Sequence, residues 1–165
     1  VNDKGFLSRI LDFQPDFILC SITQRLTSET LELLGDRFIN AHGSWLPRYR
    51  GPAQYFWYIY NNESQFGVTL HFMDSGLDTG DIIFQKTFDF EKNISAYRLH
   101  YQIANVLGAL FVQFIDMLVK HNNVPRIRQN DNESTFTVIP SREDARRFRS
   151  LGYRWITFKD FFSCV

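Results

Sequence analysis

Residues 40–81 read NAHGSWLPRYRGPAQYFWYIYNNESQFGVTLHFMDSGLDTGD. The stretch carries an amide and an imidazole at Asn40 and His42, a basic LPRYRG loop, and a glycine-punctuated segment that contains Asp78. Each lies beside a predicted strand end or sharp turn, which is where α/β folds keep their binding groups. An amide, an imidazole and a carboxylate that converge there are suited to acyl transfer without a metal or a covalent nucleophile.

Hydrophobic periodicity outside this stretch predicts alternating helices and strands. Apolar residues at three- and four-residue steps from Leu99 to Met117 predict one long helix with a single apolar stripe. Strands alternating with helices predict an α/β domain with a mostly parallel sheet flanked by helices. The expected helices are 3–13, 28–35, 52–60, 95–120 and one from 141, and the expected strands are 16–22, 37–41, 67–73, 81–89 and 135–139.

Composition narrows the possible partners and the cellular location. Eighteen Lys+Arg balance 18 Asp+Glu, so no net charge draws the chain to nucleic acid or to a membrane. The two cysteines, Cys20 and Cys164, are too few for a disulfide framework or a zinc site, and Cys20 lies in an apolar run that predicts an inert thiol. We expect no signal peptide and no apolar run of membrane-spanning length, so the expected location is cytoplasmic.

The candidate catalytic residues are Asn40, His42 and Asp78. In extended chain, residues i and i+2 share a face, so Asn40 and His42 are expected to point into one cleft. The amide suits a developing oxyanion, the imidazole suits proton transfer, and a carboxylate at Asp78 would orient His42 and raise its pKa. The alternatives are a loop-capping Asn with a surface His, and an ordinary acidic turn.

Two further groups are candidates for substrate binding. Arg48 and Arg50 precede an expected helix start, which predicts an anion site, although a solvated loop is the alternative. Tyr153 and Trp155 follow an Arg-rich tail and could stack on a base, although a solvated amphipathic helix paired to its own acids explains the tail equally well.

The motifs NAHGSWLPRYRG, GVTLH and MDSGLDTGDII together resemble the formyltransferases that use 10-formyltetrahydrofolate. That family includes glycinamide ribonucleotide formyltransferase, methionyl-tRNA formyltransferase and the sugar-nucleotide N-formyltransferases. The motifs cover residues 40–83 closely and residues 16–120 loosely. The resemblance implies a Rossmann-like formyltransferase fold, 10-formyltetrahydrofolate as co-substrate, no metal, and a catalytic triad of Asn40, His42 and Asp78.

The resemblance also implies roles within the reaction. Asn40 and a protonated His42 would stabilise the oxyanion while Asp78 sustains the charge on His42. His71 would sit beside the reacting centre, which favours members other than methionyl-tRNA formyltransferases. The folate pocket would be bordered, largely through backbone groups, by Leu70, His71, Phe72, Met73, Asp74, Gly76 and Leu77.

The chain departs from the family at its start, where the first strands of the sheet are missing. We therefore expect residues 1–122 to be an N-terminally truncated catalytic domain and 123–165 a C-terminal extension. The extension is too short for the tRNA-binding barrel of methionyl-tRNA formyltransferases, and Trp45 replaces a usually aliphatic residue. The short extension, the zero net charge and the Arg and aromatic residues after Asn122 favour a nucleotide-linked amino sugar as acceptor, with small-molecule partners, no nucleic acid, no membrane and a possible homodimer. Methionyl-tRNA, a ribonucleotide amine, or a catalytically silent fragment are the alternatives.

Overall fold

The computed structural model describes residues 2–22, 24–121 and 123–162, so Cys164 lies outside the described residues. The elements match the predicted ones to within a few residues at most ends. In chain order they are α1 (Lys4–Phe13), β1 (Ile18–Cys20), α2 (Ser28–Leu34), η1 (Gly35–Arg37), β2 (Phe38–His42), α3 (Gln54–Tyr60), β3 (Gln65–Phe72), β4 (Ile82–Asp89), α4 (Ala96–His121), η2 (Asp131–Glu133), α5 (Arg142–Ser150) and η3 (Phe158–Phe162). The expected strand over 135–139 is absent from the described residues, where Phe136 makes only an isolated bridge to Arg50.

The sheet is mixed and has the order β1-β2-β3-β4. β1 and β2 run parallel, whereas β2 and β3, and β3 and β4, run antiparallel. The α/β class is confirmed, but the expectation of a mostly parallel sheet is wrong for the described residues. The connection from β3 to β4 spans residues 73–81 and contains no helix. It is too short for the crossover of about a dozen residues or more that a parallel pair requires.

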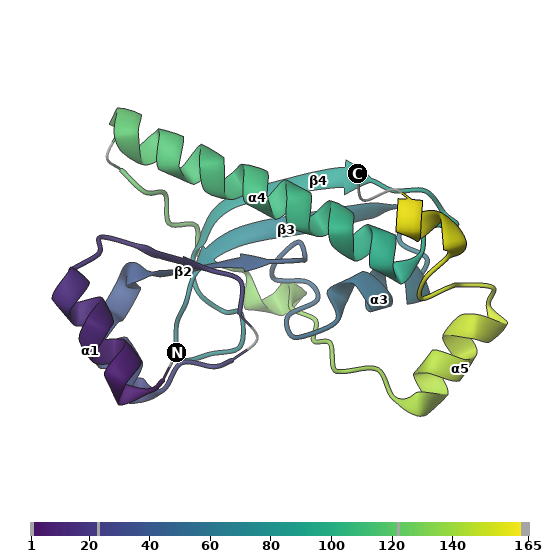
Figure 1. The fold of residues 1–165 in the computed structure, drawn as a ribbon, viewed down its shortest axis with the longest axis horizontal. Coiled ribbons are helices and arrows are strands. Elements are labelled where there is room, and N and C mark those ends of the chain that lie inside the picture. Colours follow the sequence, from purple (N-terminus) through teal and green to yellow (C-terminus); the bar gives the residue numbers. More distant parts are fainter. Residues whose placement is uncertain (1, 23, 122, 163–165) are drawn as a thin grey trace.

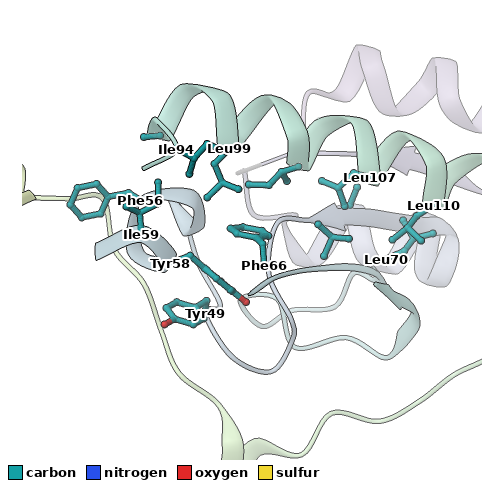
Figure 2. Packing of buried hydrophobic residues seen from close by; sticks show 14 of the residues in the cluster. Tyr49, Phe56, Tyr58, Ile59, Phe66, Leu70, Ile94, Leu99, Leu107 and Leu110 are labelled. Atoms are coloured by element: carbon teal, nitrogen blue, oxygen red, sulfur yellow. The ribbon is translucent and has the colours of Figure 1, made fainter. Parts of the chain in front are cut away.

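Helix α4 lies across one face of the sheet and covers the main core (Figure 1). Its inward side chains meet the buried face of β3 and the aromatic residues of α3 (Figure 2). The predicted stripe is confirmed, because its buried members are Leu99, Ile103, Leu107, Leu110 and Phe114. A second cluster forms where α1 and α2 pack beside β1 at the other end of the sheet (Figure 1). Its buried members are Leu7, Leu26, Leu34 and Phe38.

The tail, which here means residues 123–162, packs on the main core cluster. Phe148 of α5 is fully buried against Phe56 of α3, with stacked rings 4.7 Å apart. Ser141 is the N-cap of α5 and forms a capping box with Asp144, so the helix starts where the sequence predicts one. The division into two domains at residue 122 stays a prediction.

Helix α4 is long and apolar enough, by length and composition alone, to cross a membrane between Ala96 and Lys120. The expectation that the chain contains no such run is therefore wrong by that test. The test is weak evidence, since the core helix of a soluble protein passes it too, and here the apolar stripe of α4 packs on the sheet.

Gly67 and Gly108 form a matched pair for a stability test. A Cβ on Gly67 of β3 would lie 2.8 Å from the backbone nitrogen of Trp45, whereas a Cβ on Gly108 of α4 would meet nothing within 4 Å. We expect Gly67→Ala to lower the free energy of unfolding by about 1–3 kcal/mol through overpacking. Gly108→Ala should raise it by about 0.5–1 kcal/mol, because alanine suits a helix better than glycine. Urea denaturation of the chain measures both, and equal effects would contradict this packing of Trp45 on β3.

Candidate active site

Strand β2 sends alternate side chains into the core and into a pocket. Ile39 and Ala41 join the main core cluster, while Asn40 and His42 line a cavity of about 420 Å³. This is the alternation expected of extended chain. All five residues of β2 are buried, so both polar side chains are held away from bulk water. Asn40 and His42 therefore line one cleft, as predicted.

The amide of Asn40 is oriented by two contacts. Its Oδ1 accepts a hydrogen bond from the backbone N–H of Ile22 at 3.2 Å, which fixes which end of the amide is the oxygen. Its Nδ2 lies 3.3 Å from Nε2 of His71, which is the residue paired with Asn40 across β2 and β3. One N–H of the amide serves His71, and the other is available to a group bound in the cavity.

His42 is buried and its two ring nitrogens face different partners. Nε2 lies 3.1 Å from the carbonyl oxygen of Tyr49, which can only accept, so Nε2 carries the hydrogen. Nδ1 then faces Oδ1 of Asp78 at 3.6 Å. Desolvation lowers the pKa of His42, while the Asp78 carboxylate and the Tyr49 carbonyl act in the opposite direction. The resting imidazole is therefore neutral near pH 7, and protonation would occur at the nitrogen that faces Asp78.

His71 is held as a neutral ring by the same logic. Its Nδ1 donates to the carbonyl of Phe72 at 2.7 Å, which leaves Nε2 as the acceptor for the amide of Asn40. Burial, with repulsion from His42, lowers the pKa of His71 to about 4 despite the nearby Asp78. Its Nε2 lies 3.8 Å from Oδ1 of Asp78.

Asp78 reaches both imidazoles from the loop between β3 and β4. Its backbone adopts a left-handed φ of 55°, and its Oδ2 accepts a hydrogen bond from the backbone N–H of Gly51 at 2.8 Å. The following Gly80 packs directly against the carbonyl oxygen of Phe72, where a Cβ would not fit. The glycine allows the close loop path that the sequence pattern suggested. Asn40, His42 and Asp78 thus come together at one end of the sheet.

The family model described as "Formyl transferase" matches residues 2–115. The chain belongs to the formyl transferase family. The resemblance drawn from the three motifs is therefore confirmed at the level of the family, and the α/β layout is that of the Rossmann-like formyltransferase fold.

Individual relatives differ in the acceptor named for them. Methionyl-tRNA formyltransferase of Clostridioides difficile (strain 630) is 38% identical over 142 residues, which are 86% of this chain and 46% of that protein. The N-formyltransferase from Helicobacter canadensis, solved with folinic acid and dTDP-3-aminofucose, is 32% identical with a TM-score of 0.62, over 74% of this chain and 43% of that one. Phosphoribosylglycinamide formyltransferase from Bacillus halodurans is 26% identical with a TM-score of 0.65, over 72% and 62%. The chain spans about half the length of the curated relatives it matches.

The residues expected at the folate divide into two groups. His71, Met73, Asp74, Gly76 and Leu77 line the cavity around His42. Leu70 and Phe72 do not, because their side chains are buried in the main core cluster. Any contribution from these two positions is limited to their backbone groups.

The two loop arginines lie outside this pocket. Arg48 pairs with Glu63 and lines a smaller cavity of about 260 Å³ beside Trp57. Arg50 is 2% exposed, and its guanidinium donates to Gln129 and to Asp131. The interpretation of Arg50 as a substrate anion site is therefore contradicted by its burial, and its role is to join the loop to the tail.

Tyr153 and Trp155 also lie elsewhere. Both rings pack on Phe148, and Trp155 stacks on Phe56 with centroids 5.2 Å apart. Neither lines the pocket around His42. The stacking partners of these rings are core aromatics, so the expectation that they hold a substrate base is not supported by their position.

Several pocket residues have no recognisable signal in the sequence. Gln54, at the start of α3, donates to the carbonyl of Gly51 and places its Nε2 3.3 Å from Nε2 of His42. The other side of the cavity is formed by residues 21, 22 and 24–26, which follow β1, and by the N-terminal half of α4. Its remaining polar or aromatic lining residues are Ser21, Gln24, Arg25, Tyr55 and His100. Only the order of elements in space brings these groups together.

His42, His71 and Asp78 also have the spacing of a metal site, with one ligand atom from each lying within 4.8 Å of the others. Each imidazole donates its far N–H to a backbone carbonyl, which is a common arrangement around metal-binding histidines. The same contacts orient a proton-transfer site. The resemblance drawn from the motifs implies proton transfer by His42 and Asp78 and no metal.

The buried histidines predict a pH dependence of stability. An unfolded His71 takes up a proton near pH 6.5, whereas the folded one does so only near pH 4. Between these values the unfolded state binds more protons, so the free energy of unfolding should fall as pH falls and be fully retained above 6.5. His42 acts in the same direction. Urea midpoints across this range measure the effect, and His71→Gln should reduce it. A wild-type midpoint independent of pH would contradict the burial of these rings.

Proposed function

We propose that the full protein containing this chain transfers a formyl group from 10-formyltetrahydrofolate to a primary amine in the pocket of Asn40, His42 and Asp78. The observation that carries the proposal is their convergence. An amide N–H, a neutral imidazole and a carboxylate 3.6 Å from that imidazole share one buried cavity. The folate supplies the formyl group, and every proton movement falls to the protein.

His42 acts as the base. Its Nδ1 accepts the proton that the amine loses as the new C–N bond forms, and the imidazolium then pairs with Asp78. The free N–H of Asn40 donates to the developing oxyanion, since its other N–H is taken by His71. As the bond from the formyl carbon to the folate nitrogen breaks, His42 returns the proton to that nitrogen. The lowered pKa of His42 means that the imidazolium, which the resemblance implies at the oxyanion stage, is formed during the reaction.

The folate fits the wall formed by residues 73–77. A cavity of about 420 Å³ lies within the usual range of roughly 300–1,000 Å³ for small-molecule sites. Asp74 ties this wall into a turn by accepting from the backbone N–H of Gly76 and the hydroxyl of Thr79. Backbone groups on a fixed turn are suited to reading the edge of a heterocycle. The H. canadensis relative, which was solved with folinic acid, supports this choice of co-substrate.

For the acceptor, we propose a nucleotide-linked amino sugar in the cytoplasm. Support comes from the amino-sugar nucleotide named for the H. canadensis relative and from the balanced charge of the chain. Arg25 lines the pocket and Arg50 does not, so we propose Arg25 as the residue that contacts a phosphate of the acceptor. The second candidate is methionyl-tRNA, which is favoured by the 38% identity to the C. difficile protein.

The test supplies the full-length protein with 10-formyltetrahydrofolate and either nucleotide-linked 3-amino and 4-amino sugars or methionyl-tRNA. Formylation of a sugar, weakened at least tenfold by Arg25→Ala, is the expected result. Formylation of the tRNA alone would assign the second candidate and refute the first. Size-exclusion chromatography on the same preparation tests the proposed homodimer.

A further inference from the structure

The tail contacts the loop that carries Asp78, between β3 and β4, through the buried side chain of Gln129. Ile127 exchanges backbone hydrogen bonds with Ile82 at 2.8 and 3.0 Å, which places the tail beside the strand that follows the Asp78 loop. Farther along, the backbone N–H of Arg50 donates to Thr135, and that of Thr137 donates to Arg50. The tail is thereby fixed on both sides of Gln129.

The side chain of Gln129 uses both ends of its amide. Nε2 donates to the carbonyl of Asp78 at 2.9 Å and to the carbonyl of Gly80 at 2.7 Å. Oε1 accepts from Nε and Nη2 of the buried Arg50 at 3.1 and 2.7 Å. The residue is 6% exposed, so water does not compete freely for these bonds.

These bonds bear on the backbone of Asp78 itself. Asp78 has a φ of 55°, in the left-handed region that aspartate enters more readily than most residues but that still benefits from bonds that hold it there. Gly51, next to Arg50, donates its N–H to the Asp78 carboxylate at 2.8 Å. Gln129 therefore holds the carbonyl of Asp78 and, through Arg50, the loop whose backbone holds the carboxylate.

We infer that Gln129 is a positioning residue for catalysis, which keeps the Asp78 carboxylate opposite Nδ1 of His42. The tail thus serves the reaction directly, in addition to any contact with the acceptor. This inference rests on the proposed function, because it assigns Gln129 a part in that same site.

The test is Gln129→Met in the full-length protein, which keeps the length of the side chain and removes both the N–H donors to Asp78 and Gly80 and the oxygen that accepts from Arg50. A displaced carboxylate lowers turnover without removing a binding group, so kcat should fall by about tenfold to a hundredfold while KM for the folate changes by less than about threefold. Gln129→Glu is the second variant. It keeps an acceptor for Arg50 but presents a carboxylate oxygen to the carbonyls of Asp78 and Gly80, and kcat should fall as far.

Gln85→Met is the matched control. Gln85 donates its Nε2 to the carbonyl of Leu46 and to the hydroxyl of Thr69, so its loss removes two comparable bonds without touching the Asp78 loop. Its kcat should stay within about twofold of wild type. Equal losses in Gln85→Met and Gln129→Met, or an unchanged kcat in both Gln129 variants, would overturn the inference.

A measurement without turnover separates this inference from the proposed function. The groups that face the ring of His42 are Asp78, His71, Gln54 and the carbonyl of Tyr49. If the carboxylate moves away, His42 in Gln129→Met should titrate at lower pH than in wild type by nitrogen-15 NMR, and Gln85→Met should match wild type. Identical titration in all three proteins overturns the inference, even where wild type transfers no formyl group and the proposed function fails.

Discussion

His42→Ala is expected to lower kcat for formyl transfer by about 10²–10⁴-fold, the usual contribution of a positioned acid–base group. The reason is geometric. His42 is the imidazole whose free nitrogen faces a carboxylate, at 3.6 Å from Asp78, while its other nitrogen is fixed by Tyr49. The ring lines the cavity, so it can reach a bound amine.

The control for this variant is binding. Alanine leaves the wall at residues 73–77 intact, so the dissociation constant for 5-formyltetrahydrofolate should change by less than about tenfold. His42→Gln, which can donate to the Tyr49 carbonyl but cannot take up a proton, should be as slow as His42→Ala. Near-normal turnover in either variant would show that another group moves the proton.

Asn40→Ala should lower kcat by about 10²–10³-fold, which is the typical loss of one oxyanion donor. The Asn40 amide is held by the backbone N–H of Ile22 on one side and by His71 on the other, so its remaining N–H has a fixed direction. Asn93→Ala is the matched control, because Asn93 is exposed in the turn before α4. Equal turnover in Asn40→Ala and Asn93→Ala would remove the amide from the mechanism.

The local part of this site could be predicted from the sequence. Alternation along a strand sends Asn40 and His42 the same way, and glycines beside Asp78 indicate a close turn. Both are properties of neighbouring residues. The same is true of the stripe on α4, where spacing alone marks the buried face.

The remainder depends on contacts between distant segments. Arginine is usually a surface residue, and Arg50 is buried only because Gln129 and Asp131, far along the chain, accept its hydrogen bonds. Trp155 stacks on Phe56 for the same kind of reason, since its partner lies on α3, far away in the sequence. No local pattern distinguishes such residues from binding residues.

The error in strand direction had a readable cause. The stretch between Met73 and Asp81 is too short for a helical crossover, so β3 and β4 must form an antiparallel pair. The antiparallel pairing of β2 with β3 sets His71 directly opposite Asn40. The contact between these two side chains therefore could not be predicted from a sheet that was assumed to be parallel.

The fate of the formyl group tests the central claim most directly. The full-length protein is given 10-formyltetrahydrofolate labelled in its formyl carbon, with and without the amino-sugar acceptor, and the label is followed in the acceptor amide and in free formate. We predict that the label passes to the amine when the acceptor is present, and that Asp78→Asn slows this transfer by about 10²-fold or more. Release of the label as formate at one rate, with or without acceptor, would contradict the account and make the pocket that of a hydrolase.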